Sequence, residues 1–163
     1  MNTATQPLSA HSTRYLVCVD EHEESRVALR LACMKANARG LEVSMVHVIT
    51  PADFQTLGAI ADRMREERRR EGQQLLDQLA GEAFATYGIK PKTLLREGPT
   101  GDEILQTALE DVDVNIIVIG MAQQAAGRGK LASWLAVQLG SKLFIPLLMV
   151  PGNLTDQQLH SLT

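Results

Sequence analysis

Five short apolar runs are spaced along the chain, and turn residues follow each of them. They are "RYLVCVD", "EVSMVHVI", "KTLLREG", "VNIIVIG" and "IPLLMVP". Runs of this length that are rich in valine, isoleucine and leucine are typical of buried β-strands. The third run is the most polar and the fourth is the most strand-like. The pattern therefore predicts five strands.

Helical periodicity fills the gaps between these runs. After the first run, Val27, Leu31, Met34 and Ala38 recur at helical spacing, and Gly40 ends the helix. A longer helix is predicted from about residue 57 to residue 86. Its apolar stripe consists of Ile60, Met64, Leu75, Leu79 and Ala83. The segments "GDEILQTALE" and "KLASWLAVQL" predict two more helices, and the first of them begins with acids, as the helix dipole favours.

Strands that alternate with helices indicate right-handed crossovers and a parallel sheet covered on both faces. The predicted fold is an α/β, Rossmann-like domain whose five strands form a sheet of order 3-2-1-4-5 with helices on both faces. Residues 1–13 are expected to be a flexible lead-in, residues 14–151 the domain, and residues 152–163 a polar tail without an assigned structure.

Composition limits the partners and the location. A formal net charge of -3 over 163 residues gives no reason to expect binding to nucleic acid. No apolar run approaches the roughly 20 residues that cross a bilayer, and the first residues lack the layout of a secretory signal. Cys18 and Cys33 fall in strand and helix patterns, where cysteine usually acts as a small buried hydrophobe. We expect a cytoplasmic protein that binds neither membrane nor nucleic acid.

A ligand site is expected where the winding direction of such a sheet reverses, beyond the carboxyl ends of its strands. The reversal lies between the first and fourth strands, which end at Asp20 and Gly120. The turn "DEHEES" after the first strand is acidic, whereas residues 121–155 contain no Asp or Glu. The cations of that stretch are Arg128, Lys130 and Lys142. An anion is therefore expected at the start of the helix after the fourth strand, and a hydrogen-bond donor such as adenine or ribose near Asp20.

Four segments in this order closely resemble the universal stress proteins, the UspA family: "YLVCVDEHEESRVALRLA", "VSMVHVI", "REGPTGDEILQTALE" and "VNIIVIG". The likeness extends over nearly all of residues 15–151 and includes the last apolar run. The resemblance implies a Rossmann-like domain, usually a homodimer, that acts in stress resistance rather than in a defined metabolic reaction. It also implies that Asp20 and the backbone near Val48 would face an adenosine.

Members of that family that bind ATP carry the motif G-x2-G-x9-G-(S/T) after the fourth strand. Laid on this chain without gaps, the motif falls on Gly120, Gln123, Ser133 and Trp134, so that only its first residue matches. A side chain at Gln123 obstructs the close backbone approach that glycine permits. We also expect the indole of Trp134 where a small hydroxyl would meet a phosphate oxygen. ATP binding as in the typical binders is therefore not expected.

The chain offers two other places for a phosphate. A gapped match would put a Gly-Ser pair at residues 140–141, near the negative end of the helix, and is rejected. The segment "GRGK" could instead form its own nest of amides. Its residues are Gly127, Arg128, Gly129 and Lys130. We expect that no cofactor is required. Binding of ATP or AMP, or weak binding of another anion, stays open.

No catalytic arrangement can be defended. Asp20, His22 and Glu24 match no standard set of metal ligands, and a solvated turn is the better interpretation. His47 is expected to be packed or hydrogen-bonded, and "RMREERRREG" to be a solvated helix face on which acids and bases pair. Receiver domains share the alternating pattern, but "LLREG" and "LLMVP" stand where they need an acid and a lysine. The protein is expected not to be an enzyme.

The last strand carries an uninterrupted apolar run at the edge of the predicted sheet: Leu147, Leu148, Met149 and Val150. Antiparallel pairing of two copies would cover it, and the resemblance implies such a homodimer. The alternative is that the tail from Gly152 folds over the edge.

The leading hypothesis is a dimeric, non-enzymatic stress-response protein with a degraded ATP loop, which acts through an unidentified protein partner or a metabolite. The alternative is a nucleotide-dependent switch.

Overall fold

A computed structural model describes residues 14–51, 58–122, 129–142 and 144–163, and the predicted lead-in, residues 1–13, lies outside them. The described residues form a five-stranded sheet of order β3-β2-β1-β4-β5, in which every neighbouring pair is parallel. The predicted α/β class and strand order are confirmed. The strands are β1 (Arg14–Cys18), β2 (Glu42–Ile49), β3 (Lys92–Glu97), β4 (Val114–Met121) and β5 (Leu147–Pro151).

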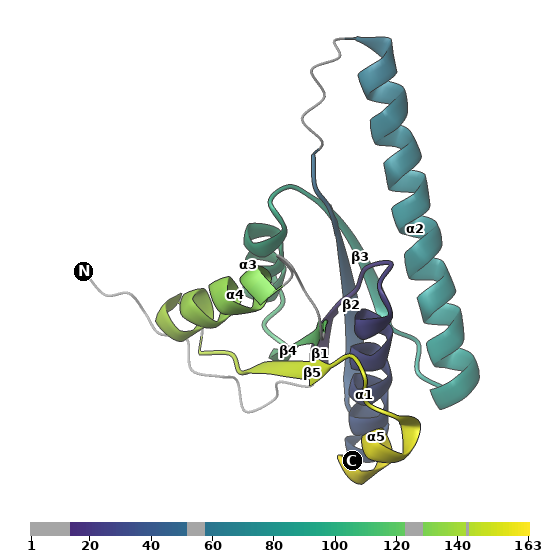
Figure 1. Ribbon diagram of the computed structural model, residues 1–163, viewed down its shortest axis with the longest axis vertical. Coiled ribbons are helices and arrows are strands. Elements are labelled where there is room, and N and C mark those ends of the chain that lie inside the picture. Colours follow the sequence, from purple (N-terminus) through teal and green to yellow (C-terminus); the bar gives the residue numbers. More distant parts are fainter. Residues whose placement is uncertain (1–13, 52–57, 123–128, 143) are drawn as a thin grey trace.

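Helices cover both faces of the sheet. They are α1 (Glu23–Arg39), α2 (Ala59–Tyr87), α3 (Thr100–Glu110), α4 (Gly129–Lys142) and a short α5 (Asp156–Ser161). Figure 1 shows α1 and α2 on one side of the strands and α3 and α4 on the other. The alternation of side chains along β1 explains the two layers, because the neighbours Leu16 and Val17 are both 0% exposed yet belong to different apolar clusters.

Helix α2 departs from the predicted stripe. It has 29 residues, about 43 Å at 1.5 Å per residue, whereas the six residues of β3 span only about 20 Å. The sheet therefore cannot cover its whole length, and Figure 1 shows its first turns beyond the end of the sheet. Ile60 and Met64 are 61% and 39% exposed, so their assignment to the buried stripe is wrong. The buried residues begin at Gly72, and Leu76 joins Leu79 and Ala83 among them.

The tail has a structure that the sequence did not assign. Thr155 caps α5 in a capping box with Gln158. Leu159 is 0% exposed and belongs to the cluster that α1 contributes to, and Lys35 Nζ of α1 donates to the carbonyl of Leu162 at 2.6 Å. One buried leucine and a complete cap are enough to dock this short polar helix on α1.

Candidate functional site

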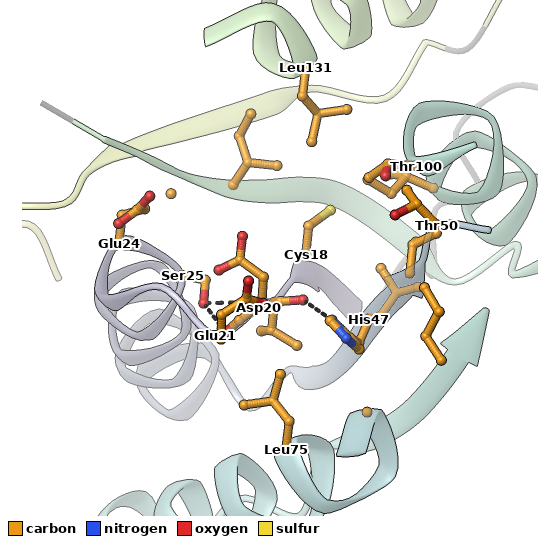
Figure 2. A pocket seen from close by; sticks show the side chains of 18 of the residues that line it. Cys18, Asp20, Glu21, Glu24, Ser25, His47, Thr50, Leu75, Thr100 and Leu131 are labelled. Carbon is orange, nitrogen blue, oxygen red and sulfur yellow. Dashed lines mark hydrogen bonds between the residues drawn. The ribbon is translucent and has the colours of Figure 1, made fainter. Parts of the chain in front are cut away.

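A cavity of about 650 Å³ opens at the carboxyl end of the sheet, beyond the neighbouring strands β1 and β4 (Figure 2). Asp20 and Gly120, a hundred residues apart in sequence, both line it. Val48, at the end of β2, lines it as well. The structure therefore brings the ends of the first and fourth strands to one cavity, as the predicted strand order requires.

The two sides of the cavity differ in chemistry. One side carries four carboxylates: Asp20, Glu21, Glu24 and Glu71. The lining residues of α3, β4 and α4 are mostly apolar; besides Thr100 and Gly120 they are Ile104, Ile119, Met121, Leu131 and Ala132. Among the described residues that line the cavity, the single arginine or lysine is Arg68 of α2.

Ser25 holds the turn between β1 and α1 together. It is 3% exposed, and its hydroxyl accepts from the Asp20 amide at 3.2 Å and lies 3.0 Å from the carbonyl oxygens of Asp20 and His22. The His22 amide donates to Asp20 Oδ1 at 2.8 Å. Because these two amides are bonded within the turn, they are not offered to a phosphate, in agreement with the acidic character of this side.

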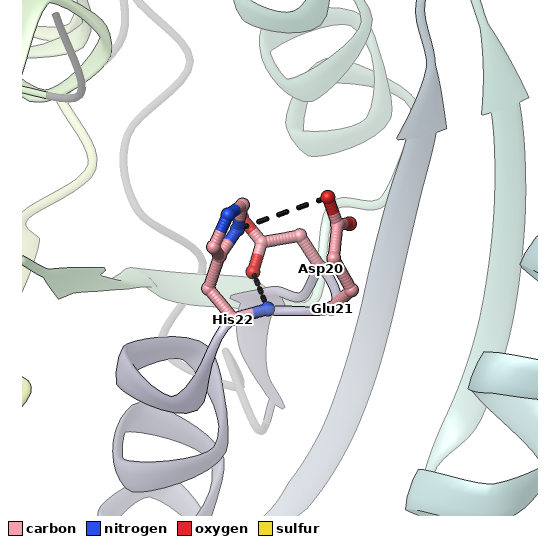
Figure 3. A group of neighbouring side chains, drawn as sticks. All are labelled: Asp20, Glu21 and His22. Atoms are coloured by element: carbon pink, nitrogen blue, oxygen red, sulfur yellow. Dashed lines mark hydrogen bonds and ion pairs between the residues drawn. The ribbon is translucent and has the colours of Figure 1, made fainter.

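Asp20, Glu21 and His22 form a small group at the same turn (Figure 3). His22 Nδ1 lies 3.2 Å from Asp20 Oδ2 and 3.9 Å from Glu21 Oε1. The sequence suggested Glu24 as the third member, whereas the structure brings in Glu21. The side chain of Asp20 is 46% exposed, that of Glu21 74% and that of His22 37%. One imidazole and two carboxylates could hold a divalent cation, but this exposure fits the solvated turn that the sequence indicated.

Close packing explains why residue 120 is a glycine. A Cβ there would lie 2.1 Å from the carbonyl oxygen of Glu24 and 2.9 Å from the Ser25 amide nitrogen. Gly152, after β5, is similarly close to Glu24, at 2.6 Å from its Cβ. The first turn of α1 thus crosses the ends of β4 and β5 in van der Waals contact. The one residue that matches the ATP motif is therefore needed for the fold, whatever it does for a ligand.

The expected phosphate side is described only in part. Gln123, Gly127 and Arg128 lie outside the described residues. Gly129 begins α4, Lys130 and Ser133 are exposed, and neither of these two is among the lining residues. The α4 side chains at the cavity are the apolar Leu131 and Ala132.

Trp134 is not where the sequence placed it. A Cβ on Gly101, in the first turn of α3, would lie 2.4 Å from its ring, so the indole packs on α3. It is outside the cavity lining, although the sequence led us to expect it where a small hydroxyl would meet a phosphate oxygen. The helical rotation of α4 explains the difference, because Leu131 and Ala132 face the cavity while Trp134 is directed at the neighbouring helix.

His47 is held by its neighbours, as predicted. Its Nδ1 lies 2.8 Å from the carbonyl oxygen of Val19, which can only accept, so Nδ1 carries the proton (Figure 2). The other side of the ring abuts Gly72 of α2, where a Cβ would lie 3.2 Å from His47 Cδ2. The imidazole is fixed between β1 and α2.

The thiols are unreactive. Burial, with a contribution from the charge of Asp20, raises the pKa of Cys18 to about 12, and burial raises the pKa of Cys33 to about 12 as well. Both are free cysteines. A thiol with such a pKa forms almost no thiolate at neutral pH and is a poor nucleophile.

Sequence reasoning missed the contribution of α2. Arg68, Glu71, Gly72 and Leu75 line the cavity, and the first three belong to "RMREERRREG", for which the sequence indicates a solvated face. Gly72 was the available signal, because a glycine inside a helical pattern often marks a close approach. Here a Cβ would lie 2.9 Å from Leu95 Cδ1. The arginines also pair across elements, with Arg65 and Arg69 both on Glu97 of β3, rather than only along the helix.

The comparisons with known proteins agree with this fold. A sequence model described as the universal stress protein family matches residues 12–151, which is most of the chain. The chain belongs to the universal stress protein family. Among curated proteins, none matches this sequence. In the described parts of the chain, no helix of this universal stress protein combines the length and the hydropathy that crossing a membrane demands.

Solved structures share its fold. A universal stress protein family member from Burkholderia pseudomallei aligns with a TM-score of 0.68 at 22% identity, over 87% of this chain and 98% of that one. A universal stress protein from Archaeoglobus fulgidus in complex with dAMP gives 0.58 at 22% identity, over 86% and 98%. One from Arabidopsis thaliana with AMP bound gives 0.59 at 16% identity, over 85% and 91%.

Proposed function

We propose that this universal stress protein is a non-enzymatic binding or regulatory protein that works as a cytoplasmic homodimer and does not hold ATP in the manner of the motif-bearing members. The observation that carries the proposal is the charge distribution of the strand-end cavity. The described α4 side chains that line it are apolar, and four carboxylates are among the other lining residues. Among the described residues, those of α4 that line the cavity are Leu131 and Ala132, whose side chains offer a triphosphate neither a hydrogen-bond donor nor positive charge.

The repulsion between a phosphate and these carboxylates can be given a magnitude. Two unit charges 4 Å apart interact by about 4 kcal/mol at an effective dielectric constant of 20. Several phosphate charges beside Asp20, Glu21, Glu24 and Glu71 would each add repulsion of this order before screening. The amides of the β1–α1 turn do not offset it, because Asp20 and His22 amides are bonded within the turn.

The proposal of a non-enzymatic role is supported by the state of the candidate reactive groups that line the cavity. The pKa of the Cys18 thiol is raised by burial, His47 Nδ1 is bonded to Val19, and the Ser25 hydroxyl is shared with two backbone carbonyls. None of these described groups is arranged as an activated nucleophile beside a base. Robust turnover of ATP or of another substrate by the purified protein would refute this part.

The proposed dimer uses β5, the end strand of the sheet. Leu147 and Leu148 are partly buried, Val150 is buried and Met149 is 51% exposed. The tail does not serve as the proposed cover, because α5 docks on α1. Met149→Asp should convert a dimer of twice 17.8 kDa into a monomer in light scattering, while Leu109→Asp, at an exposed position of α3, should not. A monomeric wild type at micromolar concentration would contradict the dimer.

Nucleotide titration tests the proposal that the protein does not hold ATP in the manner of the motif-bearing members. ATP, ADP and AMP would be added with and without magnesium, and binding measured by the shift in melting temperature. A ligand at 100 times its dissociation constant stabilises a protein by about 2.7 kcal/mol, which raises the melting temperature by several degrees. We expect no such shift with millimolar ATP. A shift that Asp20→Ala abolishes would favour the second candidate.

That second candidate is a nucleotide-dependent switch. Asp20 and Val48 line one cavity, and relatives from Archaeoglobus fulgidus and Arabidopsis thaliana have been solved with dAMP and AMP. In this version Asp20 faces the base or ribose. The groups around the phosphates would be Gly120, Gly127, Arg128 and Lys130. Micromolar ATP affinity would establish it in place of the first candidate.

A further inference from the structure

We propose that a groove between α1, α2 and α5 is a second ligand site, which takes a zwitterionic α-amino acid with an apolar side chain. The groove has a volume of about 780 Å³, within the range of about 300–1,000 Å³ that is usual for small-molecule sites. Among the described residues, none lines both this groove and the strand-end cavity. The site therefore goes beyond the proposed function and does not depend on it.

The bottom of the groove is apolar. Helix α1 packs against both α2 and α5, and residues of all three helices line the groove. Figure 1 shows α5 against the lower part of α1, with α2 to the right. Of the apolar lining residues, Leu29, Leu79 and Ala83 are buried, whereas Met34 and Tyr87 are half-buried. Met34 and Tyr87 therefore offer surface on which an apolar side chain of a ligand can pack.

Arg30 of α1 supplies a positive charge that its neighbours hold loosely. Its Nη2 lies 3.4 Å from Glu23 Oε1, and its Nη1 lies 4.0 Å from Asp156 Oδ1. A guanidinium and a carboxylate that are well paired lie about 2.7–2.9 Å apart. Arg26, one helical turn earlier, is paired in this way, because its Nη1 lies 2.9 and 2.7 Å from the two carboxylate oxygens of Glu82. Arg30 is thus the arginine of the groove that can turn to the carboxylate of a ligand.

Asp156, in the first turn of α5, places a negative charge beside Arg30. Its side chain is 81% exposed, and the long contact with Arg30 is the one ion pair that it forms with described residues. A ligand with a single charge would engage one member of this pair and leave the other without a partner. An α-amino acid carries a carboxylate and an ammonium on the same carbon, so it can engage both.

Tyr87 and His160 add polar atoms beside the two charges. The Tyr87 hydroxyl has no hydrogen-bond partner among the described residues, and it can donate to a carboxylate. Burial raises the pKa of Tyr87, and the charges of Arg30 and Asp156 also act on it in opposite directions. His160 Nδ1 lies 2.7 Å from the carbonyl oxygen of Asp156, which can only accept. Nδ1 therefore carries the proton, and Nε2 of the neutral ring can accept from an ammonium.

The test is calorimetric titration of the full chain with L-leucine and two of its derivatives. N-acetyl-leucine lacks the ammonium, and leucinamide lacks the carboxylate. The variants Arg30→Gln and Asp156→Asn each remove one charge and keep most of the side chain. Arg39→Gln is the matched control, because Arg39 is exposed in the last turn of α1 and is outside the groove lining.

Wild type should bind leucine at least about fivefold more tightly than either derivative. Arg30→Gln should weaken leucine by about fivefold or more without weakening leucinamide, which has no carboxylate for Arg30 to hold. Asp156→Asn should weaken leucine by a similar factor without weakening N-acetyl-leucine, which has no ammonium. Arg39→Gln should change the affinity for leucine by less than about twofold.

Three results would overturn the inference. Folded wild type could fail to bind leucine at millimolar concentration, the three compounds could bind wild type equally, or Arg30→Gln and Asp156→Asn could bind leucine as wild type does. A loss in Arg39→Gln as large as that in Arg30→Gln would also reject it, because the effect would then not belong to the groove. None of these measurements involves the strand-end cavity, the dimer or turnover, so a failure here is distinct from a failure of the proposed function.

Discussion

Replacing Gly120 by alanine separates a role in folding from a role in binding. The added Cβ would lie 2.1 Å from Glu24 O and 2.4 Å from its carbonyl carbon, both backbone atoms of the first turn of α1. Backbone cannot rotate away as a side chain can, so α1 and the end of β4 must move apart by about 1 Å to restore ordinary contact. Overpacking typically destabilises by about 1–3 kcal/mol, and we expect about 3 kcal/mol or more here. That is a large part of the roughly 5–15 kcal/mol that stabilises a domain.

Equilibrium urea unfolding followed by circular dichroism, at one fixed protein concentration, measures the change. Gly81→Ala is the control, because Gly81 lies in α2 with no atom within 4 Å of an added Cβ, and it should gain up to about 1 kcal/mol. If Gly120→Ala unfolds within about 0.5 kcal/mol of wild type, the packing argument is wrong. If that stable variant also loses a nucleotide that wild type binds, the glycine serves the ligand instead.

Three further results are expected. Leu159→Ala should lower the free energy of unfolding by about 2–5 kcal/mol in the same assay, because its side chain is 0% exposed. Burial raises the pKa of Cys18 and Cys33 from 9.0 to about 12, so the unfolded chain loses these protons first and the free energy of unfolding should fall as pH rises from 9 to 12. Hydrogen bonds from Arg96 and then Gln106 lower the pKa of Glu110, so Arg96→Ala should raise that pKa in an NMR titration.

One outcome would contradict each of these three predictions. Leu162, which is 48% exposed, provides the comparison for Leu159: if alanine at both positions has the same effect, α5 does not dock through Leu159. Rapid alkylation of native Cys18 or Cys33 by iodoacetamide at pH 8 would show that the thiols are accessible and their pKa values ordinary. A Glu110 pKa unchanged by Arg96→Ala would mean that the ion pair does not persist in solution.

The elements and their order could be predicted from the sequence because the signals are local. The second apolar run coincides with β2, Glu42–Ile49, and the helix before it ends at Gly40 with a left-handed φ of 66°. Alternating strands and helices predicted a doubly wound parallel sheet, and the order 3-2-1-4-5, once adopted, placed Asp20 and Gly120 at one crevice; the structure has this order. None of this required knowing which side chain touches which.

The details of the cavity depended on contacts between elements. The sequence could not tell that α2 is longer than its sheet, and so it assigned Ile60 and Met64 to the same apolar stripe as Leu79, and Arg68 to a solvated face. It could not tell that Trp134 packs on Gly101, or that Glu24 fills the space beside Gly120.

The sequence by itself determined the fold class, the strand order, the family resemblance and the place of the crevice, because hydrophobic periodicity and chain connectivity are properties of neighbouring residues. The tertiary structure alone decided which charges line that crevice. The rotation of a helix about its axis and its closest point of approach are set by a few side-chain contacts from distant parts of the chain, such as those of Gly72 with His47 and Leu95.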